Sequence, residues 1–274
     1  MSERPEQGTD KEARGGHDKK GGRPMPGTSG MGTHEVDVLE YGGQEDGERQ
    51  KMDRRLFMEL LVYDTPPELH VGEMIAELGK ALDAAGIAGV IYEDTANPSG
   101  LALLTWSEDP ALFVQKVRPI LNDAKFRKLV LKPEFTMIGR TYSSGYEPDL
   151  EYWLLRRPAE NCLADTSQWA VWYPLRRSGD FARLPPREQG GILREHAVIG
   201  RAYGEAGLAT DVRLACHGLD THDNEFVIGL LGKDLYPLSH VVQTMRKTRQ
   251  TSEYIVQMGP FFVGHVAWRG QGTS

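Results

Sequence analysis

Histidine is the residue type of this sequence with the clearest potential for chemistry, because one of its eight copies lies on the apolar face of an expected helix. The segment Pro186–Gly204 predicts that helix, in which Ile192, His196, Ile199 and Tyr203 recur at spacings of four, three and four. This spacing places the four side chains on one face, directed at a sheet. Two interpretations of His196 are open. It is a core histidine satisfied by a backbone carbonyl, or a neutral imidazole held rigidly as an axial ligand of haem iron.

Other common catalytic patterns are absent from the sequence. No glycine-rich phosphate-binding motif opens a helix, no HExxH or metal-spaced Cys/His cluster occurs, and no GxSxG motif suggests a serine nucleophile. Among the remaining histidines, His217 and His222 lie at an expected turn, where turn chemistry explains them better than ligation. His240 lies on an expected helix and His265 on an expected strand, and neither has a partner that the sequence identifies.

Composition predicts a soluble, cytoplasmic protein. The chain has 274 residues, of which 39% are hydrophobic and 26% charged, with a net charge of −7 and a pI near 5.7. The negative charge argues against nucleic acid as a partner. No run approaches the roughly 18 apolar residues of a membrane span, and no apolar segment follows the first basic residues as in a secretory signal. Cys162 and Cys216 form no CxxC pattern, which fits a reducing cytoplasm.

The apolar residues are distributed unevenly, which predicts three parts. Residues 1–33 contain no Leu, Ile, Val, Phe, Tyr or Trp, so they cannot bury enough surface to offset chain entropy. We expect residues 1–51 to form a disordered or weakly ordered tail, with one short strand at His34–Tyr41. Residues 52–168 would form a first structural repeat with a partly helical linker at 142–168, and residues 169–274 a second repeat.

Two halves of the chain share one pattern. Ala85-Gly86-Ile87-Ala88 is echoed by Ala206-Gly207-Leu208-Ala209, and Ile138-Gly139 by Val263-Gly264. The distance from Asp109 to Gly139 is 30 residues, as is the distance from Asp234 to Gly264. Several matches in the same order indicate an internal duplication.

Both halves predict the same order of elements. In the first half we expect strands at Leu56–Tyr63, Gly89–Tyr92, Leu101–Trp106 and Lys132–Arg140, and helices at Val71–Ala85 and from Asp109-Pro110 to Asn122. In the second half we expect strands at Trp169–Leu175, Val212–His217, Glu225–Leu231 and within Tyr254–Trp268, and helices at Pro186–Gly204 and Leu238–Lys247. The order β-α-β-β-α-β, repeated twice, predicts an α+β fold of two fused ferredoxin-like units that join their sheets into a dimeric α+β barrel.

The second half resembles a known family. Leu193-Arg194-Glu195-His196-Ala197-Val198-Ile199-Gly200-Arg201-Ala202-Tyr203 is similar to the haem-ligand helix of the chlorite dismutase superfamily. Tyr173-Pro174-Leu175-Arg176-Arg177 is similar to the Tyr-Pro-x-x-Lys/Arg motif of its coproheme decarboxylase branch. Three further segments complete the pattern in order: Gly218-Leu219-Asp220, Asn224-Glu225-Phe226 and Gly259-Pro260-Phe261-Phe262-Val263-Gly264. The resemblance covers residues 170–266 well and the first half only in architecture.

The resemblance implies roles for individual residues. His196 would be the proximal iron ligand, and its second ring nitrogen should donate to a carboxylate or carbonyl. Tyr173 would relay an electron and a proton during oxidative decarboxylation; its alternative is an aromatic side chain that packs on the core. Arg177 would hold a propionate, since a guanidinium forks onto a carboxylate; its alternative is a solvated arginine. Arg156 or Arg157 would hold another propionate.

The resemblance also implies a distal residue on the strand that follows the haem-ligand helix. Counting back from Glu225 gives Arg213, whereas counting back from Gly218-Leu219-Asp220 gives Asp211. We favour Arg213, because pairing at Glu225 should set the register and a cation there could stabilise a bound anion or peroxide.

The implied function is a peroxide-dependent coproheme decarboxylase, in which iron coproporphyrin III is both substrate and cofactor and haem b is the product. The alternatives are a chlorite-decomposing enzyme or general haem peroxidase, a haem carrier or sensor without turnover, and a cofactor-free barrel in which His196 is structural. Coproheme, hydrogen peroxide and possibly chlorite are the expected small-molecule partners. Family analogy implies a homo-oligomer, a pentamer.

Overall fold

Alternating side chains form the two faces of each strand in the computed structural model, which describes residues 36–273. In β3 (Phe57–Asp64), Met58, Leu60 and Val62 are buried in the interior of a closed sheet, whereas Tyr63 packs under a helix on the outside. This two-residue period is the expected signature of a strand with one face in each of two cores.

The two repeats have the predicted order of elements. The first contains β3, α1 (Val71–Ala84), β4 (Gly89–Asp94), β5 (Gly100–Ser107), η1 (Phe113–Val117) with α2 (Arg118–Leu121), and β7 (Met137–Thr141). The second contains β8 (Trp169–Arg177), α5 (Pro186–Glu205), β9 (Thr210–Ala215), β10 (Phe226–Gly232), α6 (Leu235–Met245) and β12 (Phe262–Gly270). The remaining elements are β1 (Glu40–Glu45), β2 (Glu48–Met52), β6 (Val130–Leu131), η2 (Pro133–Phe135), η3 (Tyr152–Arg156), α3 (Arg157–Leu163), α4 (Gly179–Arg183), η4 (Gln250–Tyr254) and β11 (Ile255–Met258).

Strand order confirms two ferredoxin-like units. The first repeat runs β7-β3-β5-β4 across its sheet, and the second runs β12-β8-β10-β9, which is the same arrangement. Antiparallel pairing of β4 with β12 and of β7 with β9 joins the two sheets into a closed ring. The predicted α+β barrel is therefore confirmed, and both repeats lie within one compact unit of residues 38–274.

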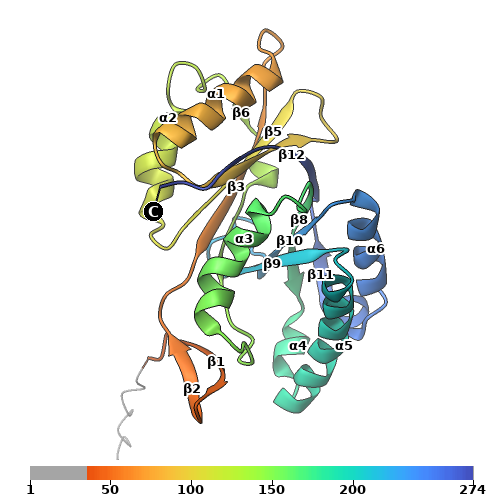
Figure 1. Cartoon of the computed structure of the whole chain (residues 1–274). Helices are drawn as coiled ribbons and strands as arrows, with labels where there is room; N and C mark the ends of the chain where they lie inside the picture. The colour runs from red at the N-terminus through yellow and green to blue at the C-terminus, as the bar shows by residue number, and fades with distance from the viewer. Residues whose placement is uncertain (1–35, 274) are drawn as a thin grey trace, which may run out of the picture. The chain divides into compact units, whose positions relative to one another are not determined.

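Two helical layers cover the outside of the ring. Figure 1 shows α1 and α2 over the first repeat, and α5 and α6 side by side over the second. Gly86 and Gly207 end α1 and α5 with the same backbone angle, φ +66°, which a residue without a Cβ adopts without strain. These two glycines are the residues at which the sequence pattern repeats.

Two local predictions differ from the structure. Residues 133–135 form the short helical turn η2 rather than part of a strand, because Pro133 cannot donate a backbone hydrogen bond to a ladder. In addition, β1 and β2 form a hairpin at residues 40–52, within the segment that composition predicts to be weakly ordered. The hairpin is tied to β7 by the Arg140–Glu40 ion pair at 2.9 Å, and to the chain after β7 by the Gln50 side chain, which donates to the carbonyl of Pro148 at 2.9 Å.

The predicted tail covers residues 1–51, and residues 1–35 of it lie outside the described residues. Val36 and Asp37 are exposed and belong to no helix or strand. Within residues 36–273, no helix combines the length and the hydropathy of a membrane span. Both cysteines, Cys162 and Cys216, are free and buried.

Candidate functional site

Strand register brings two predicted site residues into one row on the outer face of the second repeat. Ile228 of β10 pairs with Tyr173 of β8 on one side and with Arg213 of β9 on the other. Directly paired residues of neighbouring strands point to the same face of a sheet. The row Tyr173–Ile228–Arg213 therefore lies on the face that α5 and α6 cover, where Tyr173 belongs to the outer core of this repeat.

His196 lies on α5 and is half-buried. Its Nδ1 is 3.4 Å from the hydroxyl of Thr248, which is 1% exposed and itself donates to the carbonyl of Met245 at 2.8 Å. Because the Thr248 proton is directed at Met245, the hydroxyl accepts from His196, and the Nδ1–H tautomer is favoured. The other ring nitrogen, Nε2, then carries the lone pair that a metal ligand needs. The carboxylate or carbonyl partner that we expected is thus a neutral hydroxyl that leads on to a carbonyl.

The electrostatic surroundings keep the imidazole neutral. Burial lowers the pKa of His196 below its ordinary value, and the positive charge of Arg213 lowers the pKa further. A neutral imidazole is the form that binds a metal.

The first repeat provides an internal comparison for this layer. Counted back from Gly86 and Gly207, Ile75 corresponds to His196, Leu78 to Ile199 and Leu82 to Tyr203. The three residues of α1 are at most 5% exposed, whereas all three of α5 are only half-buried. Of the 20 residues of α5, Ile192 alone is fully buried.

The strands that face these two helices differ between the repeats in the same way. Counted back from Asp109 and Asp234, Leu101 and Leu103 of β5 correspond to Phe226 and Ile228 of β10. The β5 residues are at most 1% exposed, and the β10 residues are half-buried. The helix and sheet thus close on each other in the first repeat and leave two accessible apolar walls in the second. Such walls suit a flat apolar ring that His196 would hold through a metal.

Tyr173 is 6% exposed and stacks on Phe261, with ring centroids 4.6 Å apart. Burial raises the pKa of its phenol far above the ordinary value, and the charge of Asp211 adds to that rise. The phenol therefore stays protonated and can act as a donor of a hydrogen atom or a proton. Tyr173 therefore packs on the core and also carries a phenol that could donate a hydrogen atom or a proton.

Arg177 lies four residues after Tyr173 on β8, so both side chains are on the same face, about 13 Å apart along the strand. Its Nε donates to Glu225 at 3.2 Å, and its guanidinium lies against the rings of Phe181 and Phe226, 4.5 and 4.6 Å from their centroids. The guanidinium is therefore held in place and is not freely solvated. Among the described residues its terminal nitrogens have no hydrogen-bond partner, which leaves them available to a carboxylate.

The two distal candidates, Arg213 and Asp211, are both at the site. They are two residues apart on β9, so they share a face, and Arg213 Nε lies 3.3 Å from Asp211 Oδ2. The other carboxylate oxygen, Oδ1, accepts from Arg157 of α3 at 2.8 Å. Arg157 is thus at the site, but its guanidinium is bound to a protein carboxylate. Arg156 is exposed and pairs with Asp149 at 3.6 Å, away from this row.

Sequence reasoning did not assign a role to Tyr142 or Trp153. Tyr142 packs on Phe226 with a centroid separation of 5.4 Å, and Trp153 lies 4.4 Å from the guanidinium of Arg157. Both line a small cleft with Arg157 and Arg213. They come from the segment after β7, whose sequence has no periodicity that would relate it to β9, so no local signal could identify them.

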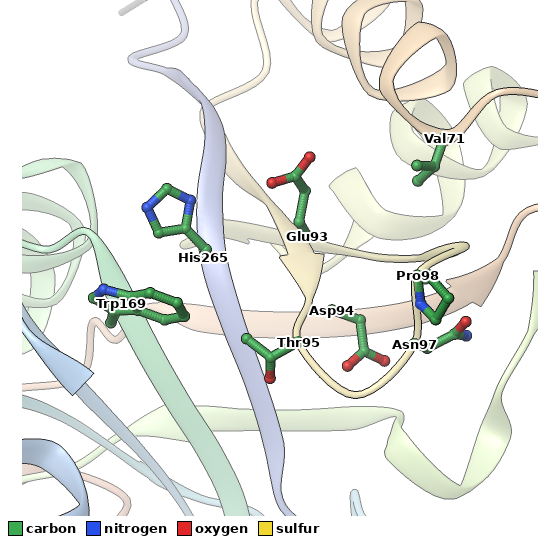
Figure 2. Close-up of a pocket in the computed structure, with 9 residues that line it drawn as sticks. Val71, Glu93, Asp94, Thr95, Asn97, Pro98, Trp169 and His265 are labelled. Carbon is green, nitrogen blue, oxygen red and sulfur yellow. The ribbon is translucent and has the colours of Figure 1, made fainter. Parts of the chain in front are cut away.

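Another cleft lies away from these residues. It has a volume of about 480 Å³ and opens where β4, β12 and β8 meet, beside Glu93, Trp169 and His265 (Figure 2). The ring of His265 packs edge-on against Trp169, with a centroid separation of 4.8 Å, which gives this histidine the partner that the sequence did not identify. None of the residues predicted to act on a ligand lines this cleft.

Together, the strand order and the closed ring define a class of protein: a duplicated ferredoxin-like α+β barrel, with the half-buried His196 on a helix of its second repeat. The sequence model described as chlorite dismutase matches residues 73–267, and the chain belongs to this family. The match includes the helix that carries His196 and the two strands that carry Tyr173 and Arg213.

Solved structures with the same fold share little sequence with this chain. A protein provisionally named a chlorite dismutase is 17% identical, with a TM-score of 0.64 and coverage of 78% of this chain and 96% of the other. A haem-binding protein from Thermus thermophilus is 21% identical, with a TM-score of 0.60 and coverage of 78% and 92%. A chlorite dismutase from Candidatus Nitrospira defluvii, solved with imidazole, is 12% identical, with a TM-score of 0.62 and coverage of 79% and 93%.

Proposed function

We propose that this chain is a haem-dependent oxidoreductase that binds iron coproporphyrin III or haem b between α5 and the sheet of the second repeat. The observation that carries the proposal is His196: a neutral imidazole with Nδ1 tied to Thr248, on a helix whose apolar face is accessible only in this repeat. The haem-binding protein with the same fold supports the choice of ligand.

Within this class we favour coproheme decarboxylation. Each propionate reacts with one hydrogen peroxide and one proton and yields a vinyl group, carbon dioxide and two water molecules. The iron porphyrin, when bound, supplies the oxidising chemistry. Tyr173 supplies a buried, protonated phenol that can exchange a hydrogen atom with a propionate side chain. Arg177, held through Nε by Glu225, offers its terminal nitrogens to a propionate carboxylate.

Mass analysis of the porphyrin tests this proposal. The protein is mixed with iron coproporphyrin and hydrogen peroxide, and we expect the porphyrin to lose the mass of two carbon dioxide molecules and four hydrogen atoms as two propionates become vinyl groups. Tyr173→Phe should bind the porphyrin and leave its mass unchanged, whereas His196→Ala should lose the Soret band. An unchanged mass with the wild-type chain, under conditions in which a known decarboxylase works, would exclude decarboxylation and leave haem carriage.

A second activity has one specific observation in its favour. Arg213 is a cation on the face opposite His196, where it could stabilise chlorite or another anion at the iron. If chlorite is the substrate, the haem-loaded protein releases oxygen from chlorite and Arg213→Gln abolishes the release. Oxygen release by the wild-type chain without any decarboxylation would favour this alternative.

We also propose that the chain forms a homo-oligomer in the cytoplasm, which is a pentamer by analogy with the family. Light scattering of the purified full chain measures its mass directly, and a single-chain mass would contradict the expected assembly.

A further inference from the structure

Asp211 connects two arginines that lie on different elements. Its Oδ2 lies 3.3 Å from Nε of Arg213, two residues further along β9, and its Oδ1 accepts from Nη2 of Arg157 at 2.8 Å. Burial raises the pKa of Asp211, but the two guanidinium groups outweigh burial, so its pKa lies below the ordinary value. The carboxylate is therefore ionised and bonded on both oxygens.

Arg157, which contacts Asp211 from α3, is itself held in place. Nη1 of Arg157 donates to the backbone carbonyl of Asp211 at 3.1 Å, and Nδ2 of Asn161 donates to the same carbonyl at 3.0 Å. The Arg157 guanidinium also lies over Trp153, 4.4 Å from its ring centroid, and its side chain is only 19% exposed. Three hydrogen bonds and one ring contact thus anchor Asp211 from α3 and η3.

Arg213 is held at Nε by Asp211, and its guanidinium lies over the ring of Trp153, 6.0 Å from the centroid. Within residues 36–273, its two terminal nitrogens form no hydrogen bond with a protein group. Arg213 nevertheless faces the helix that carries His196, because it pairs with Ile228 on the outer face of the sheet and α5 packs against β9. A guanidinium that is fixed at Nε and free at both terminal nitrogens is suited to hydrogen-bond a small anion.

We propose that Asp211 is the positioning residue of this site: the chain Arg157–Asp211–Arg213 fixes the guanidinium of Arg213 so that it captures a small anion, such as hydroperoxide or an oxyanion, opposite His196. The inference rests on the proposed haem site and specifies how that site selects its co-substrate. Arg157 acts here through Asp211 and does not touch the anion.

Fluoride binding to the ferric, haem-loaded protein separates positioning from simple charge balance. Asp211→Asn has nearly the same shape, but its single acceptor oxygen cannot hold two arginines. If Asp211 positions Arg213, the variant binds fluoride at least about tenfold more weakly, which is the loss expected for one charge-assisted hydrogen bond. If Asp211 only offsets positive charge, removal of its negative charge strengthens fluoride binding instead. Unchanged or tighter binding overturns the proposal.

Two further variants complete the experiment. Arg157→Gln releases the Asp211 carboxylate without changing a residue of β9, whose carbonyl at Asp211 keeps the hydrogen bond from Asn161, so it should weaken fluoride binding in the same direction. It also serves if Asp211→Asn fails to fold. Asp223→Asn is the matched control, because Asp223 pairs with Arg176 at 3.2 Å but its side chain is 90% exposed and lies outside the site. This control removes the same charge and should leave fluoride affinity unchanged. A wild-type chain without a Soret band overturns the proposed function, whereas a Soret band with unchanged fluoride affinity in Asp211→Asn overturns the positioning role alone.

Discussion

His196 makes the stability of the ligand-free protein depend on pH. Its folded-state pKa is lowered, chiefly by burial and further by Arg213. Below about pH 6.5, the ordinary value for histidine, the unfolded chain therefore takes up a proton that the folded chain resists. The contribution is fully present above that pH and is lost as the pH falls, at no more than about 1.4 kcal/mol per pH unit.

Urea unfolding at a series of pH values measures this dependence. The free energy of unfolding of the wild-type protein should fall more steeply below about pH 6.5 than that of His196→Gln. His222→Gln is the control, because His222 lies exposed in the turn after β9. Parallel curves for the wild type and His196→Gln would show that His196 titrates equally in the folded and unfolded chains.

Thr248 should determine the orientation of the His196 ring. Thr248→Val keeps the shape of the side chain but removes the hydroxyl that accepts from Nδ1 and donates to Met245. We expect a loss of about 1–2 kcal/mol of unfolding free energy and weaker haem uptake, because buried polar groups lose their partners. Thr248→Ser should restore both. Haem titration followed by the Soret band, together with urea unfolding, measures the two effects; equal haem affinity in Thr248→Val would exclude this role.

At the residue scale, the sequence narrowed the distal position to two candidates for a physical reason. Arg213 and Asp211 differ by two positions, so they occupy the same face of β9 under either register. The observed pairing of Ile228 with Arg213 places that residue in the row with Tyr173, and the choice of Arg213 as the distal residue stays a prediction. The ion pair between Asp211 and Arg157 comes from α3, which is distant in sequence, so spacing on one strand could not reveal it.

At the element scale, α1 and α5 have the same place in their repeats but different packing. Leu78 of α1 is 0% exposed, and its counterpart Ile199 of α5 is half-buried. We expect Leu78→Ala to cost about 2–5 kcal/mol of unfolding free energy with or without haem, because it opens a cavity in a closed core. Ile199→Ala should cost less than about 1.5 kcal/mol in the ligand-free protein, because less apolar area is lost.

Bound haem should increase the loss of unfolding free energy caused by Ile199→Ala and leave the loss caused by Leu78→Ala unchanged. A porphyrin seated against α5 would cover Ile199 and turn its side chain into a buried contact. Urea unfolding of both variants, with and without haem, gives the four values to compare. Equal costs for Ile199→Ala in the two states would place the porphyrin away from this face.

The sequence predicted helix ends and strand order better than it predicted the hairpin of β1 and β2. Gly86 and Gly207 mark the ends of α1 and α5 because both take a left-handed conformation there. The hairpin contains mainly polar and charged residues, and its position depends on contacts such as the ion pair between Glu40 and Arg140, 100 residues away. No local period encodes such a contact, so composition alone suggested weak order.

At the scale of the whole molecule, the duplication predicted the fold, but the spacing could not show how the two repeats close into one ring. That ring has a shared interior core, which draws Met58 and Leu104 from the first repeat and Trp172 and Leu214 from the second. Since β4 pairs with β12 and β7 with β9, neither sheet can leave the ring without exposing this core. The two repeats should therefore unfold together.

A substitution in the first repeat should consequently destabilise the ligand site in the second. Leu82 of α1 is 0% exposed and packs in the outer core of the first repeat, which does not include His196, so Leu82→Ala tests the coupling. If unfolding is two-state, the loss of the Soret band and the loss of far-ultraviolet circular dichroism coincide in urea, and Leu82→Ala lowers both midpoints equally.

Val198→Ala on the exposed side of α5, where Val198 is 61% exposed, should shift neither midpoint appreciably. A Soret midpoint that stays in place while the circular dichroism midpoint falls would mean that the second repeat holds its ligand without the first, and the ring would then be two independently stable halves.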